Sequence, residues 1–104
     1  MTLLSLNQRG FQQLTVDTTP VGLTMPTDLL PHHALIYVAD NPVRWRADVD
    51  GTEPSASVGT FVAANSYIDW TVADKNYKSV ITQVKFVRDA TATGPAKLDV
   101  AYFD

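Results

Sequence analysis

Hydrophobic residues in this chain tend to recur at every second position, in short stretches separated by turn-forming residues. The clearest alternation is in residues 43–48, where Val43, Trp45 and Ala47 share one side and three charged residues take the other. Side chains alternate between the two faces of a strand, so this stretch predicts a strand with one buried and one solvated face. Similar patterns predict strands over residues 11–17, 58–63, 67–72, 80–88 and 96–103.

Three segments depart from this alternation. Residues 33–40 are apolar at both sets of alternate positions, which is typical of a strand buried on two faces, and we expect a central strand here. Residues 20–31 hold three prolines and a glycine, which exclude a long helix and favour an extended or looped course. For residues 73–78 we predict either one helical turn or an open loop.

These elements predict one all-β domain, because 104 residues is the size of a single domain and about seven or eight short strands indicate an antiparallel β-sandwich. Jelly-roll-like and immunoglobulin-like strand orders fit equally, and a small barrel also remains open. We interpret residues 32–104 as the sandwich core. Residues 1–31 form an N-terminal strand and a proline-punctuated arm, part of the same domain or an assembly arm. The predicted core includes Ile36, Val38, Trp45, Val84, Phe86 and Val100.

Composition removes several classes of function. With no cysteine, the chain has no disulfide, thiolate metal site or cysteine nucleophile. Eight basic against eleven acidic residues give a formal net charge of -3, which argues against nucleic acid as a partner. No apolar run reaches the roughly 18 residues of a membrane span, and the N-terminus lacks the features of a signal peptide. We expect a soluble chain made in the cytoplasm, with a thin stability margin that favours oligomerisation.

Candidate chemical sites have simpler interpretations. His32 and His33 point to opposite sides of an extended chain, so we interpret them as the polar start of a strand and not as a metal site. Asp48, Asp50 and Gly51 resemble the opening of a calcium loop, but no bidentate acid follows at the required spacing. We interpret this segment as an acidic hairpin tip.

Motifs for catalysis are missing from the sequence. It has no serine-nucleophile turn and no glycine-rich phosphate loop, and Asp69, alone in its strand, does not supply both an acid and a base. We therefore predict a protein that is not an enzyme and takes no metal or cofactor.

Surface residues give the candidates for a partner interface. Arg44 and Arg46 lie two residues apart on one strand face and could clamp a carboxylate of a partner, although a solvated strand face is the simpler interpretation. Tyr67 and Tyr77 are the aromatic residues that we expect to be exposed. The full set of interface candidates is Arg44, Arg46, Asp48, Asp50, Glu53, Tyr67 and Tyr77.

A family resemblance covers the chain from about Leu35 to its C-terminus. It is carried by residues 39–48 (ADNPVRWRAD), then 51–59 (GTEPSASVG), 66–70 (SYIDW) and a closing 98–103 (LDVAYF). These segments resemble a family of short proteins encoded among the virion genes of tailed bacteriophages. The most telling part is PVRWR followed by GTxPSASVG.

The resemblance implies a β-sandwich virion component, and we favour a capsid decoration (cement) protein. It implies synthesis in the host cytoplasm and a place on the capsid surface, with the major capsid protein and further copies of the chain, as a homotrimer, for partners. Neither nucleic acid nor membrane is expected. The alternatives are a carbohydrate- or receptor-binding module, which would have a glycan partner, and a tail or neck adaptor. The segment 19–31 could add a strand to a neighbour's sheet.

Overall fold

The computed structural model describes residues 8–24, 31–72 and 79–103 and contains eight strands and one helical turn within them. Their bounds are β1 Gln8–Val16, β2 Val21–Gly22, β3 His33–Ala39, β4 Val43–Arg46, β5 Thr60–Val62, β6 Ser66–Thr71, α1 Val80–Gln83, β7 Lys85–Arg88 and β8 Ala96–Phe103. The predicted strands are thus all present except over residues 80–84.

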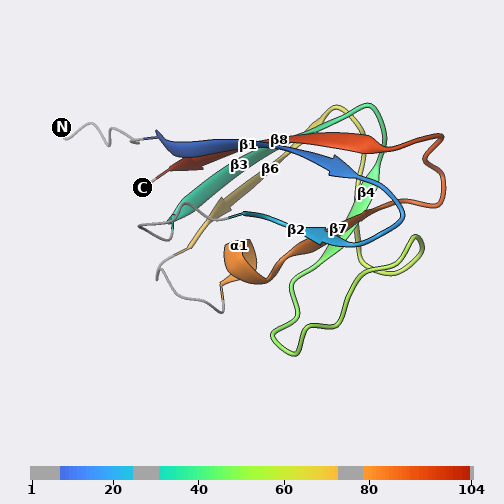
Figure 1. Cartoon of the computed structure of the whole chain (residues 1–104), viewed down its shortest axis with the longest axis horizontal. Helices are drawn as coiled ribbons and strands as arrows, with labels where there is room; N and C mark the ends of the chain where they lie inside the picture. Colours follow the sequence, from blue (N-terminus) through green and yellow to red (C-terminus); the bar gives the residue numbers. More distant parts are fainter. Residues whose placement is uncertain (1–7, 25–30, 73–78, 104) are drawn as a thin grey trace.

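The strands form two four-stranded sheets, which we call sheet A (order β1-β8-β3-β6) and sheet B (order β2-β7-β4-β5). In Figure 1, β1, β8, β3 and β6 form the upper layer, with β2 and β7 below. All pairings are antiparallel, and they are nested: β1 pairs with β8, β2 with β7, β3 with β6 and β4 with β5. This nesting is the strand order of a jelly roll, so the predicted β-sandwich is confirmed and the immunoglobulin-like order is excluded.

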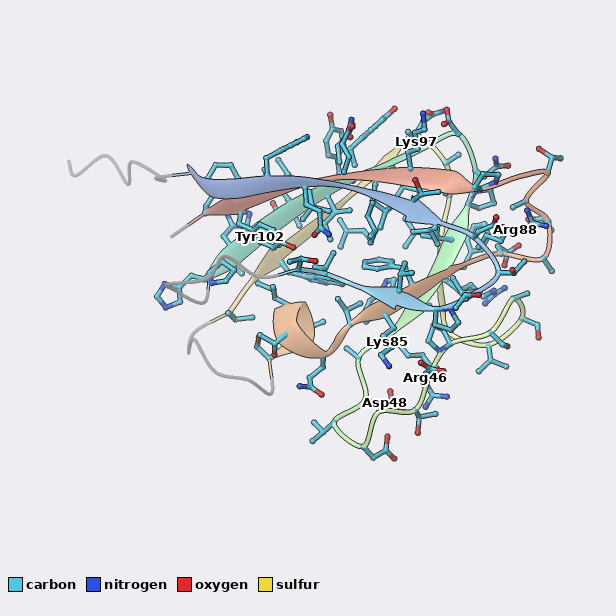
Figure 2. The ribbon with its side chains drawn as sticks, viewed as in Figure 1. Arg46, Asp48, Lys85, Arg88, Lys97 and Tyr102 are labelled. Carbon is cyan, nitrogen blue, oxygen red and sulfur yellow. The ribbon has the colours of Figure 1, made fainter. Side chains whose placement is uncertain are left out.

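The core lies between the two sheets. Ile36 and Val100 from sheet A are fully buried, as is Phe86 from sheet B. The predicted core residues are confirmed, except that Trp45 is half-buried and packs against the rim of the core, edge-on to Trp70 with ring centroids 4.9 Å apart. Figure 2 shows Tyr102 between the sheets, and its hydroxyl donates to Gln12 Oε1 over 3.1 Å. Burial raises the pKa of Tyr102.

The prediction of one continuous strand over residues 80–88 is wrong. Residues 80–83 form the turn α1, in which Ser79 O accepts the backbone N–H groups of Thr82 and Gln83 over 3.1 and 3.0 Å, and only residues 85–88 form a strand. The turn brings Ile81 and Val84, three residues apart, onto the side that faces the core, where both are almost fully buried. Tertiary burial thus overrides the strand preference of these β-branched residues.

The prediction for residues 33–40 is only half confirmed. β3 lies between β8 and β6, as expected of a central strand, and its inward residues Ala34, Ile36 and Val38 are buried. Its outward residues, Leu35 and Tyr37 among them, are only half-buried, because no further layer of the described chain covers this side of sheet A (Figure 1). The second apolar side of β3 is therefore left uncovered by the part of the chain that the structure describes.

The N-terminal region is part of the sandwich where it is described. β1 is an edge strand of sheet A and β2 is an edge strand of sheet B, so a boundary near residue 31 does not separate these strands from the core. Residues 25–30, which belong to the predicted arm, lie outside the described residues. The predicted turn or loop over residues 73–78 lies outside them as well.

Candidate functional site

The two outer faces of the sandwich differ in chemistry. The outer side of sheet B carries charged residues, among them Arg46 and Lys85, and the loop between β4 and β5 lies beside it, as Figure 2 shows for Arg46, Asp48 and Lys85. Pro54 of this loop is buried, and it lines a hollow of about 280 Å³ together with Val87, which is itself only 3% exposed. The chain therefore covers part of this face with its own loop.

Arg44 is held by contacts within the chain. Its Nε donates to Asp89 Oδ1 over 2.5 Å and its Nη1 donates to the carbonyl oxygen of Gly59 over 2.9 Å. The guanidinium lies 5.5 Å from the centre of the Phe61 ring, and the side chain is 25% exposed. These contacts join β4 to β5 and to the residue after β7, so Arg44 serves the fold and has little capacity left for a partner.

Asp89 is the buried charge at the centre of this network, with 3% of its surface exposed. Its Oδ2 accepts hydrogen bonds from the hydroxyl of Thr91 over 2.6 Å and from the backbone N–H of Thr91 over 2.9 Å. These two donors, together with the Arg44 guanidinium, lower the pKa of Asp89 from 3.8 to about 2. All of these donors stabilise the ionised carboxylate.

We expect the ionised Asp89 and its hydrogen-bond donors to make the folded state less stable at acid pH. Because the folded-state pKa of Asp89 lies below its unfolded value, its contribution is fully present above about pH 4 and is lost as pH falls towards 2. Asp89→Asn should therefore unfold at lower urea concentration than wild type at pH 7, with the difference shrinking as pH approaches 2. Urea midpoints measured from pH 2 to 7 test this, and a difference that stays constant across the range contradicts it.

The remaining sheet-B candidates also have partners within the chain. Arg46 pairs with Asp48, and the Nζ of Lys85 lies 2.9 Å from Glu53 Oε2 at a more exposed position. Asp50 accepts hydrogen bonds from the backbone N–H and hydroxyl of Thr52 over 3.0 and 2.8 Å, which lowers its pKa. This Asx turn is the acidic tip predicted from the sequence.

The outer side of sheet A is different, and we call it the A face. Directly opposite residues of antiparallel strands share a face, so the register places Leu35 in one row with Ala101, Phe11 and Asp69. The next row holds Tyr37, Tyr67, Asp99 and Gln13, and a third holds His33, Phe103 and Thr71. A fourth row holds Ala39, Lys97 and Thr15, so the A face mixes apolar and aromatic side chains with polar and charged ones.

Exposure and ring contacts show how open the A face is. Phe11 and Tyr67, on the two edge strands, are 58% and 67% exposed. The rings of Tyr37 and Tyr67 lie 4.9 Å apart with a tilt of 52°, and those of His33 and Phe103 lie 5.3 Å apart. Large apolar side chains in adjacent rows of one exposed sheet face are typical of an interaction surface.

Several polar groups on the A face have partners within the chain. His33 pairs with Asp69, the side-chain amide of Gln13 donates to Asp99 over 3.0 Å, and the hydroxyl of Tyr37 donates to Asn65 over 3.1 Å. A carboxylate that already accepts a hydrogen bond loses less on leaving water than a bare one. These pairings reduce, but do not remove, the cost of taking the carboxylates of Asp69 and Asp99 out of water when a partner covers the A face.

The structure divides the sequence-predicted candidates into two groups. Arg44, Arg46, Asp48, Asp50 and Glu53 belong to sheet B and its loop and are engaged within the chain, whereas Tyr67 lies on the A face. Tyr77 lies outside the described residues. Sequence reasoning missed Phe11, Leu35, Tyr37 and Phe103 as surface residues. The signal for Leu35 and Tyr37 is the second set of apolar positions in β3, which the pattern alone assigns to two-sided burial. Phe11 and Phe103 lie in β1 and β8, and only the strand register places them on this face.

Comparison with known proteins gives no relative: no family model, curated protein or solved structure matches this chain. Among the described residues, no group of three or more histidine and acidic side chains is arranged to hold a metal ion. The helical turn α1 spans only four residues, and no described helix is long and apolar enough to cross a membrane.

Proposed function

We propose that this chain is a structural component of a bacteriophage virion, a capsid decoration protein that binds the outer shell as an oligomer and stabilises it. The observation that carries the proposal is the open A face with its exposed large side chains Phe11 and Tyr67, on a sandwich whose other outer face is partly covered by its own loop and ion pairs. The bacteriophage setting rests on the resemblance of residues 39–48, 51–59, 66–70 and 98–103.

The physical requirements of decoration match such a sandwich. A cement protein needs a rigid body and a complementary patch, and it reaches high total affinity by repeating modest contacts over several copies. The buried rows of Ile36, Val100 and Phe86 supply the rigid body, and the A face supplies a patch for association between copies. The proposal therefore asks for association only and needs no chemical step.

The glycan-binding alternative finds less support in the ring geometry. Sugars stack on flat aromatic platforms, and the rings of Tyr37 and Tyr67 are inclined by 52° to each other, so they do not form one plane. The alternative predicts millimolar binding of glycans in calorimetric titration, abolished by Tyr67→Ala. Decoration predicts no such binding.

Particle composition and heat stability test the proposal. We expect particles of a phage that carries this gene to contain on the order of hundreds of copies of the chain, because repeated contacts make decoration effective. Particles from a deletion mutant should release DNA at a lower temperature, and adding back the purified chain should restore the wild-type temperature. About a dozen copies or fewer would instead identify a tail or neck adaptor, and no binding to particles would reject a virion role.

A further inference from the structure

We infer that a second copy of this chain covers the A face, so that two sandwiches pack sheet A against sheet A about a two-fold axis. The inference rests on the proposed function, because it assigns the A face to the contact between copies in the decorating oligomer and leaves the contact with the shell to other surfaces of the dimer. It differs from the homotrimer implied by the family resemblance: a face that packs against itself is isologous and closes at two copies.

The first argument is area. Four strands about 4.8 Å apart and roughly seven residues long at about 3.3 Å per residue give a flat footprint of about 440 Å² per copy. Two copies thus contribute about 900 Å² of flat footprint. The accessible area of the protruding side chains is larger than this flat footprint, so the area buried between two copies reaches the roughly 1,000 Å² of a specific interface. Smaller patches on the molecule, such as the hollow beside Pro54, do not offer this area.

The second argument is shape. All β-sheets twist with the same hand, and two such sheets pack face to face at about 30° with side chains interdigitating across about 10 Å. Sheet A already packs against sheet B on its inner side, through the buried cluster that includes Ile36, Val100 and Phe86. Its outer side has the same regular rows, with Leu35 and Ala101 small enough at the centre to receive larger rings from a copy. A second sheet A is therefore a sterically suitable cover.

The third argument is charge. The chain carries a formal net charge of -3, so two copies repel each other over most approaches. On the A face, however, the described acidic residues Asp69 and Asp99 are accompanied by Lys97, and Asp69 is paired with His33. Figure 2 shows Lys97 pointing outward on the side of sheet A, away from the Arg46 and Asp48 cluster. Because the A face carries charges of both signs, two copies that meet through this face do not place only negative groups opposite each other.

The test is the mass of the purified chain in solution, measured by light scattering after size exclusion at tens of micromolar. We expect twice the 11.4 kDa of one chain for wild type. Leu35→Lys, at the centre of the A face beside Asp69, should weaken self-association at least about 30-fold, as for a residue central to an interface, and Phe11→Lys, at the edge of the face, should weaken it by a smaller factor. The control Val49→Lys replaces an apolar residue 62% exposed in the β4–β5 loop and should stay dimeric.

Circular dichroism with thermal melting of each variant separates lost association from lost folding, and Phe11→Lys should fold because its side chain is largely exposed. A wild-type mass of one or three copies overturns the inference, as does a dimer that survives both A-face substitutions. A monomeric chain that still binds particles overturns only the dimer and leaves decoration standing. A dimer that binds no particles overturns only the proposed function.

Discussion

Replacing Phe86 by alanine is expected to lower the free energy of unfolding by about 3–5 kcal/mol, the usual loss for a fully buried aromatic ring. Phe86 is 0% exposed in β7, and its ring lies 6.3 Å from that of Trp70 across the core. The cavity left by the missing ring should not be filled by movement of the neighbouring strands, because Val21 and Trp45 are held opposite residue 86 by the strand pairing. Urea unfolding followed by tryptophan fluorescence measures the loss.

The matched control is Phe61→Ala. Phe61 lies on the edge strand β5, is 48% exposed, and contacts the guanidinium of Arg44 at 5.5 Å. Losing an exposed ring and one cation–π contact should reduce stability by about 0.5–1 kcal/mol. Equal losses for the two phenylalanines would contradict the division into core and surface. Because a typical domain has only about 5–15 kcal/mol in total, the Phe86 variant should be the one close to unfolding.

The fold class was predictable because alternation is a local signal. In residues 43–46 and 96–103 every second side chain faces the core, so the pattern itself reports which side is buried. The strand order was not predictable, because β1 pairs with β8 across about eighty residues and the sequence of neither strand indicates which strand it pairs with. The turn at Val80–Gln83 was missed for a similar reason: the burial of Ile81 depends on distant parts of the chain.

The candidate site was harder to predict than the fold. Arg44 looked free because its partners, Asp89 and Gly59, are 45 and 15 residues away in the sequence. The A face was visible only as excess apolar residues in residues 33–40, and periodicity alone does not distinguish a strand covered by its own chain from one that awaits a partner. Leu35 and Tyr37 acquire that meaning only when the sandwich is known to have two layers.

Replacing Gly59 by alanine is the second substitution that we expect to reduce the free energy of unfolding strongly. It stands just before β5 with φ at +134°, and a Cβ at this position would lie 2.9 Å from the carbonyl oxygen of Trp45 and 3.3 Å from the Cβ of Pro54. Gly59→Ala therefore combines backbone strain with overlap against the backbone of β4, which does not move cheaply. We expect a loss of about 2–5 kcal/mol, measured by urea unfolding, since strain and overpacking each typically cost about 1–3 kcal/mol.

Two other glycines separate the two causes of that loss. Gly51 has φ at +82°, but a methyl group on its Cα would meet nothing within 4 Å, so Gly51→Ala should cost only the strain, about 1 kcal/mol. Gly94 has no positive φ and only the Asn41 side-chain amide at 3.8 Å, so Gly94→Ala should be neutral or slightly stabilising. The order Gly59, Gly51, Gly94 tests the close packing of the β4–β5 loop against β4. If Gly59→Ala cost no more than Gly51→Ala, the loop would have to lie farther from Trp45, and the covered face of sheet B would be more open than described.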